Sequence, residues 1–171
     1  MISREEREGA KFREGIGADV ERLSAIAVDC GLRVHSELGP GMLESAYEAV
    51  LAHRLMEKGL SVERQKVIPI IVDGVTIEQG FRADIIVEGQ LLIELKTVER
   101  LLPVHARQVL TYLKFASLPI GLLMNFSGAT FREGLKRLVH QNTNIANSNL
   151  SINQNSSRNF APSRPSREIE S

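Results

Sequence analysis

The segment FRADIIVEGQLLIELKT, residues 81–97, places the strongest constraint on the fold, because it reads as two hydrophobic β-strands joined by a turn. Three charged residues interrupt it: Asp84 in the first predicted strand, and Glu94 and Lys96 in the second. Side chains alternate between the faces of a strand, so Glu94 and Lys96 project from one face. The same alternation puts Arg82 beside Asp84 and predicts an apolar opposite face formed by Phe81, Ala83, Ile85 and Val87.

The length of the turn decides whether the two carboxylates meet. A three-residue loop at 88–90, with Gly89 in the left-handed conformation, pairs Asp84 directly with Glu94 across the strands. A two-residue loop pairs Asp84 with Ile93 instead and puts the carboxylates on opposite faces of the sheet. Both registers are open from the sequence alone.

Facing carboxylates repel each other, and burying them without compensation costs several kcal/mol. Lys96 can compensate one charge, and a divalent metal ion such as Mg²⁺ can compensate both. The alternative is an ordinary cluster of Asp, Glu and Lys on a solvated sheet face. The spacing therefore predicts either a metal site or a surface cluster.

The rest of the pattern predicts a compact α/β domain of roughly 120 residues. Helical spacing of apolar residues predicts helices over 21–38, 43–59, 103–116 and 129–140. β-Branched and apolar runs predict strands over 60–72, 75–87, 90–98 and 119–126. Pro69 indicates that the first strand lies at a sheet edge or carries an irregularity. Cys30, the single cysteine, sits among apolar residues and is expected to be a buried thiol.

The two ends differ from this domain in composition. Residues 1–20 are charged and are expected to form a loose arm, and residues 141–171 are rich in Asn and Ser and are expected to be a disordered tail. No stretch approaches the ~18 apolar residues of a membrane span, and the start lacks the apolar region of a secretory signal. A cytoplasmic protein is therefore expected.

Charge and aromatic content limit the kind of nucleic-acid binding that the chain could show. Lys plus Arg and Asp plus Glu number 21 each, so the whole molecule carries no footprint of a tight, non-specific binder. Such affinity would need a local patch or a bound metal ion. Aromatic residues make up only 5%, and no stacking platform for single strands is evident.

The arrangement of Asp84 on one strand and Glu94-Leu95-Lys96 on the next resembles the signature of the PD-(D/E)XK nuclease superfamily. The segment GMLESAY matches G-x-x-E-x-x-Y through Gly41, Glu44 and Tyr47. Together with FRADIIV, IELKTVERLLPVHARQVLTYLK and GLLMNF, it closely resembles the bacterial GxxExxY family over about residues 22–139. The resemblance implies a restriction-endonuclease-like αβββαβ core with a mixed four-stranded sheet flanked by helices, here within residues 21–140.

The resemblance also implies roles for individual residues. Asp84 and Glu94 would bind Mg²⁺ or Mn²⁺, helped by the backbone carbonyl of Leu95. Lys96 would orient the attacking water, help to deprotonate it, or stabilise charge on the phosphoryl group, and the sequence does not choose among these. Glu44, from the first core helix, would reach the same metal site directly or through water.

Further residues have a structural and a functional interpretation. Gln108 matches a glutamine that related nucleases place near the substrate, and the alternative is an ordinary helix-surface amide. Tyr112 and Tyr47 lie on helix faces that also carry core residues, so packing is the alternative to chemistry. His35 and His105 lie in segments that resemble the family, and either could line the cleft; no histidine pair has zinc-site spacing.

Basic residues near the predicted cleft and in the last predicted helix could contact phosphates or form solvated faces; they are Arg100, Arg107, Lys114, Arg132, Lys136 and Arg137. The function expected from the resemblance is a metal-dependent nuclease that acts on nucleic acid, DNA foremost, or RNA. The alternative is a catalytically silent nuclease-like module for binding or regulation. Protein partners and oligomeric state stay open, a homodimer among the alternatives.

Overall fold

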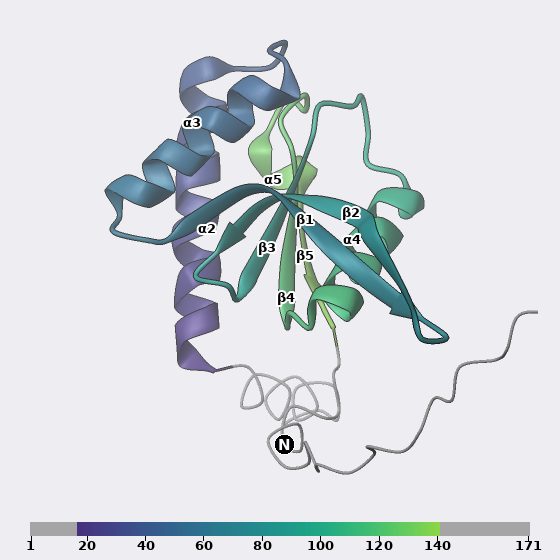
Figure 1. Ribbon diagram of the computed structural model, residues 1–171. Coiled ribbons are helices and arrows are strands. Elements are labelled where there is room, and N and C mark those ends of the chain that lie inside the picture. Colours follow the sequence, from purple (N-terminus) through teal and green to yellow (C-terminus); the bar gives the residue numbers. More distant parts are fainter. Residues whose placement is uncertain (1–16, 141–171) are drawn as a thin grey trace, which may run out of the picture.

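The computed structural model describes residues 17–140, which fold into one mixed five-stranded sheet with helices on both faces (Figure 1). The helices are α2 (Ala18–Leu38), α3 (Glu44–Glu57), α4 (Pro103–Ala116) and the single turn α5 (Phe131–Gly134). The strands are β1 (Val62–Val72), β2 (Val75–Val87), β3 (Leu91–Lys96), β4 (Ile120–Asn125) and β5 (Leu135–Val139). This order confirms the predicted α/β fold class with a restriction-endonuclease-like αβββαβ core. Most of the predicted arm and all of the predicted tail lie outside the described residues.

The strands follow one another across the sheet in chain order, from β1 at one edge to β5 at the other. The pair β3–β4 is parallel, and the other pairs are antiparallel. A parallel pair needs a crossover connection, which α4 supplies. No helix between residues 17 and 140 is long and apolar enough to cross a membrane.

The prediction of an amphipathic helix over residues 129–140 is wrong. Only Phe131–Gly134 form a helical turn, and Leu135–Val139 form β5, antiparallel to β4. The apolar residues of LKRLV fit a strand as well as a helix, since Leu135 and Leu138 pack on opposite sides of the sheet. β4 is completely buried, so its outer backbone groups need a partner strand. The sheet therefore has five strands where the sequence predicts four.

Two hydrophobic cores hold the layers together. The larger core lies between the sheet and the helices α2 and α3, and it contains Cys30, whose predicted burial is confirmed. Burial raises the pKa of this thiol. The smaller core lies between the sheet and α4, around Val109, Leu113 and Leu92. Figure 1 shows α2 and α3 on one side of the sheet and α4 on the other.

The predicted sorting of side chains along β2 is only partly right. Ile85 belongs to the larger core as predicted, but Ala83 belongs to the smaller core on the other side of the sheet. The change occurs at Asp84, opposite Gln65 of β1, whose φ of 49° lies outside the range of an ordinary strand. Gln65 thus interrupts the regular pleat of β1 opposite Asp84, and the two halves of β2 do not share one continuous pleat.

Two other local predictions are confirmed. Ile85 pairs with Ile93, a register that leaves Asp84 facing Glu94 and excludes the two-residue loop. Gly89 has the left-handed φ of 62° that this turn requires. β1 is an edge strand, and the pairing of β1 with β2 shifts between Ile68 and Ile70, on either side of Pro69.

Candidate active site

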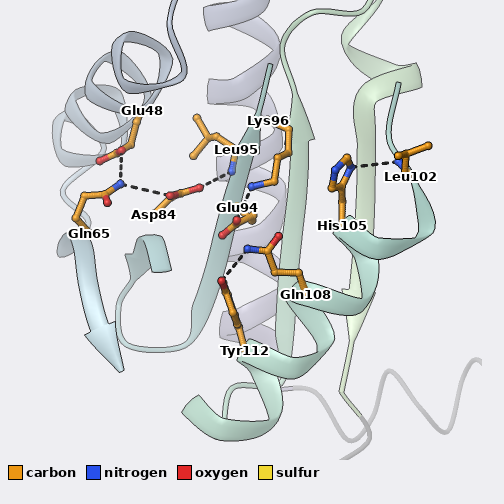
Figure 2. A network of polar contacts seen from close by, with 10 residues as sticks. All are labelled: Glu48, Gln65, Asp84, Glu94, Leu95, Lys96, Leu102, His105, Gln108 and Tyr112. Carbon is orange, nitrogen blue, oxygen red and sulfur yellow. Dashed lines mark hydrogen bonds and ion pairs between the residues drawn. The ribbon is translucent and has the colours of Figure 1, made fainter. Parts of the chain in front are cut away.

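A cleft with a volume of about 510 Å³ opens at the place where α3, the middle of the β1–β2 hairpin, β3 and α4 meet. Its lining is strongly acidic, and Figure 2 shows most of the side chains that form it. The lining residues are Glu44, Ser45, Glu48, Gln65, Arg82, Asp84, Glu94, Gln108 and Tyr112. The cleft thus brings together Glu44, Asp84, Glu94 and Gln108, which the sequence predicts to share one site.

Asp84 is held from two sides. Its Oδ2 accepts a 2.9 Å hydrogen bond from the backbone N–H of Leu95, and its Oδ1 accepts a 3.3 Å hydrogen bond from Nε2 of Gln65. Burial raises the pKa of Asp84, while the Leu95 hydrogen bond and the charge of Lys96 oppose the rise. The carboxylate is therefore fixed in orientation, although its charge is poorly solvated.

Glu94 is the most deeply buried acid of the cleft, with 3% of the residue exposed. Its Oε1 accepts a 2.6 Å hydrogen bond from Nζ of Lys96, whereas its Oε2 is buried and has no hydrogen-bond partner among the described residues. Burial, reinforced by the charge of Asp84, raises the pKa of Glu94 to about 7, against the lowering effect of Lys96. One oxygen of this carboxylate is thus available to a cation.

Lys96 carries the positive charge next to this cluster. Burial opposes that charge, but the hydrogen bond to Glu94 and the negative charges of Glu94, Glu44 and Asp84 together raise the pKa of Lys96. A raised pKa favours the neutral form of Glu94 but the charged form of Lys96. The two shifts therefore have opposite effects on the charge of this pair. Lys96 keeps its proton, because three acids surround it and a neutral amine would leave their negative charges without a nearby cation.

Glu44 is the first residue of α3 and reaches the cleft from the face of the sheet that α2 and α3 cover. Burial raises its pKa most, and the charge of Asp84 adds to the rise, while Lys96 opposes it. Glu44, Asp84 and Glu94 line the same cleft, so their negative charges repel one another.

Three residues that line the cleft, Ser45, Glu48 and Gln65, were not predicted from the sequence. Glu48, one helical turn after Glu44, is 4% exposed and accepts hydrogen bonds from Arg64 Nε at 2.8 Å and Gln65 Nε2 at 2.6 Å. The same Gln65 amide reaches Asp84, so α3, β1 and β2 are linked in one chain of contacts (Figure 2). The i, i+4 spacing of Glu44 and Glu48 could have identified Glu48. No local signal identifies Gln65, because its partners come from other elements.

Three residues had both a structural and a functional interpretation: Gln108, Tyr112 and Tyr47. The structure places the first two at the cleft and the third in the core. Gln108 lines the cleft and donates a 2.7 Å hydrogen bond to the hydroxyl of Tyr112, which also lines it. Tyr47 is completely buried and stacks on Phe126 at 4.6 Å, so packing accounts for it. Its hydroxyl donates to the carbonyl of Gly39 at 2.5 Å and fixes the loop before α3.

The histidines near the family-like segments have structural contacts instead of cleft positions. His35 is buried beside Phe126, with Nε2 2.9 Å from the carbonyl oxygen of Gly128. His105 accepts a 3.1 Å hydrogen bond from the N–H of Leu102 at the start of α4 (Figure 2).

The sequence suggested six basic residues that could contact phosphates, and none of these six lines the cleft. Arg100, Arg107, Lys114, Arg132, Lys136 and Arg137 are all exposed. Arg137 pairs with Glu21 of α2 at 2.6 Å, and the Nζ of Lys114 lies 5.6 Å from the ring centroid of Phe115. Of the two alternatives left open by the sequence, phosphate contacts or solvated faces, the cleft geometry gives no support to phosphate contacts.

The donor set fits a hard divalent cation in its chemistry. Carboxylate and carbonyl oxygens are the ligands that Mg²⁺ and Mn²⁺ prefer, and Asp84, Glu94, Glu44 and the carbonyl of Leu95 would supply them. Within residues 17–140, no three His, Cys, Asp or Glu side chains already stand around one point as a finished metal site. The unpartnered Oε2 of Glu94 and the raised pKa of all three acids are the features that a bound cation would relieve.

Comparison with known proteins gives one match. The family model for the PD-(D/E)XK nuclease superfamily matches residues 21–138, a segment that contains the whole cleft. No curated protein and no solved structure matched the chain.

Proposed function

Because the chain belongs to the PD-(D/E)XK nuclease superfamily, we propose that it is a nuclease that hydrolyses phosphodiester bonds of DNA, or of RNA, with Mg²⁺ or Mn²⁺. One observation carries the proposal: Glu94 has a buried carboxylate oxygen that accepts no hydrogen bond from residues 17–140, next to Asp84 and Lys96. A buried acceptor left unsatisfied costs about 1–3 kcal/mol, and more when it is charged. A metal-binding role would explain why Oε2 of Glu94 is buried without a hydrogen bond from residues 17–140.

Within the superfamily, we assign the chain to the GxxExxY group on the basis of Gly41, Glu44 and Tyr47. The hydrogen bonds of Tyr47 give this pattern a physical meaning. Its hydroxyl donates to the carbonyl of Gly39 and accepts from the N–H of Met42, so it braces the loop from which α3 starts. Glu44 is the first residue of that helix, and Tyr47 thus supports its approach to the cleft.

In the proposed site, Asp84 and Glu94 would hold the cation, with the carbonyl of Leu95 and with Glu44 directly or through water. When bound, a divalent cation lowers the pKa of a water molecule and neutralises charge on the phosphoryl group. Asp84 needs little reorganisation for this role, because Leu95 and Gln65 already orient its carboxylate. Hydrolysis joins the water oxygen to phosphorus, breaks the bond to the leaving oxygen and returns a proton to that oxygen.

Lys96 suits the role of a charge stabiliser in this reaction. Its raised pKa keeps it an ammonium ion, and an ammonium donates hydrogen bonds to phosphoryl oxygens. An ammonium ion can orient water and stabilise negative charge, whereas removal of a proton by Lys96 would need a cation that offsets the acids raising its pKa. Gln108, braced by Tyr112, offers an amide to the substrate at the α4 side of the cleft.

The test compares wild type with Glu94→Ala and Lys96→Ala on plasmid, linear, single-stranded, branched and RNA substrates with Mg²⁺ or Mn²⁺. Wild type should cleave at least one substrate, and both variants should lose about 10²-fold or more in rate. Arg33→Gln, on the outer helix α2, serves as a control that should keep full activity. Cleavage unchanged in both site variants would end the proposed mechanism.

The same experiment separates the nuclease from the silent module. A silent module would bind nucleic acid without cleaving it and would not depend on Lys96. Calorimetric titration with Mn²⁺ adds an independent measurement, since the proposed site requires binding that Asp84→Ala weakens.

A further inference from the structure

A second, smaller hollow adjoins the catalytic cleft. It has a volume of about 240 Å³ and is lined by Val67, Gln79, Phe81 and Arg82. Arg82 also lines the cleft, so the two hollows share this side chain as a common wall. A ligand that occupies the cleft can therefore extend past Arg82 into the smaller hollow.

The irregular pairing of the β1–β2 hairpin lies at this hollow. Ile68 pairs with Phe81 and Ile70 with Ile77, so Pro69 alone stands opposite residues 78–80 of β2. Pro69 has no N–H with which to continue the ladder. A Cβ at Gly80 would lie 2.7 Å from Cγ2 of Ile70, so only glycine allows the two strands to approach there. Gln79, which lines the hollow, belongs to this extra segment of β2.

The lining offers three kinds of contact. Arg82 is exposed and belongs to no ion pair among residues 17–140, although the cleft next to it is acidic. Val67 and the ring of Phe81 supply apolar surface, and Gln79 supplies an amide that can both donate and accept. A cation can bind a phosphate, an aromatic ring can stack on the face of a base, and an amide can form hydrogen bonds with the edge of a base.

A chain of contacts joins the hollow to the catalytic cleft. Phe81 stacks on Tyr112 with ring centroids 4.0 Å apart and an interplanar angle of 8°. The hydroxyl of Tyr112 accepts the hydrogen bond of Gln108 in the cleft. The low aromatic content of the sequence predicts no stacking platform, and folding nevertheless brings these two rings together from β2 and α4.

We propose that the smaller hollow binds the nucleotide next to the cleaved bond in a single-stranded nucleic acid. Arg82 contacts the phosphate of that nucleotide, and its base lies against Phe81 and Val67. A base can enter such a hollow only when it is free of its complementary strand. The inference rests on the proposed nuclease function, because it takes the neighbouring cleft as the place of cleavage.

The test measures binding of fluorescent oligothymidylates by anisotropy in Mg²⁺, with Lys96→Ala as the background because this variant keeps the acidic residues. Adding Arg82→Gln should raise Kd about 10-fold for oligonucleotides. It should also reduce the slope of log Kd against log salt by about 0.7, the value for one phosphate of a single strand. Arg33→Gln removes the same charge from α2, which lines neither hollow, and should leave both quantities unchanged.

A second variant tests the hollow without removing Arg82. Val67→Glu places a carboxylate at a site where the side chain is already 46% exposed, and it should weaken binding through repulsion of the phosphate. Val75→Glu, at a 63% exposed position near the hairpin turn, is the matched control and should bind like the background protein.

The outcomes separate the inference from the function on which it rests. If wild type cleaves while Arg82→Gln and Val67→Glu bind like their controls, the hollow is not a nucleotide site and the nuclease proposal survives. If no substrate is cleaved but both variants still weaken binding relative to their controls, the binding site stands and the nuclease proposal fails.

Discussion

The backbone N–H of Leu95 in β3 donates a 2.9 Å hydrogen bond to Oδ2 of Asp84 in the antiparallel neighbour β2. Asp84 is only partly buried, yet this bond sets the direction of its carboxylate independently of solvent. The acid that the site needs and the backbone that supports it thus belong to adjacent strands of one hairpin. The structure of that hairpin controls the geometry of the site.

Asp84→Asn and Asp84→Ala should therefore differ in stability but agree in metal binding. The Asn side chain can still accept from Leu95, so its free energy of unfolding should stay within about 1 kcal/mol of wild type. Ala leaves that N–H without a partner and should cost about 1–3 kcal/mol. Both lack the charge and should lose Mn²⁺ binding, which urea unfolding and calorimetry would show. Equal stability of the two variants would contradict the role of the Leu95 bond.

Glu94 should make the metal-free protein less stable as pH rises. Its pKa of about 7 in the fold exceeds the ordinary value of 4.5, so the folded protein binds more protons than the unfolded chain between these values. The free energy of unfolding should fall across that window and stay lower above it, by at most about 3 kcal/mol.

Glu94→Gln, which keeps the shape of the protonated acid, measures this effect. In EDTA it should match wild type near pH 5 and be the more stable protein at pH 8. Glu78→Gln, on the exposed part of β2, is the control and should leave the pH profile unchanged. Parallel profiles for wild type and Glu94→Gln would mean that Glu94 is not destabilised by burial.

At position 65, a glycine variant should be more stable than an alanine variant, which is the reverse of the usual order within a strand. The φ of 49° at Gln65 costs most residues about 1–2 kcal/mol, and glycine adopts it freely. Gln65→Gly should thus be about 1 kcal/mol more stable than Gln65→Ala, as measured by urea unfolding. At Lys66, which has no positive φ, the alanine variant should be the more stable one.

Both Gln65 variants should also weaken Mn²⁺ binding about 10–100-fold, the usual effect of losing a residue that orients a metal ligand. The physical reason is the loss of the amide that joins Glu48 to Asp84. Calorimetry that gave wild-type affinity would remove Gln65 from the support of the site.

Asn125 should be important for the loop that follows β3. Its Nδ2 donates to the carbonyl of Val98 at 2.7 Å and its Oδ1 accepts from the N–H of Val98 at 3.0 Å. Asn125→Ala leaves both backbone groups unpaired and should cost about 2–4 kcal/mol in urea unfolding. Asn125→Asp keeps the acceptor but loses the donor, so it should not restore stability. Full stability in either variant would contradict this role.

Much of the fold follows from patterns within short segments. The bounds of α4 follow from helical spacing and from Pro103 at its first position, and the left-handed Gly89 was predicted for one of the two loop lengths that the sequence allows. The prediction of a helix over residues 129–140 was wrong because the five-residue run LKRLV, of mixed polarity, fits the helical and the strand periods equally well. Only the otherwise unpaired edge of β4 favours the strand. Local patterns succeed where one period clearly dominates.

For the site, the sequence by itself limited the partner of Asp84 across the strands to Glu94 or Ile93, because side chains alternate along a strand, and the structure has the register in which Asp84 faces Glu94. Tertiary structure alone decided what supports them and what lies beside them. Gln65 reaches Asp84 and Glu48 only after β1 pairs with β2 and packs near α3, and Phe81 meets Tyr112 only after α4 crosses the sheet. The physical reason is range: alternation acts between neighbouring residues, whereas these contacts exist only once distant segments have packed together.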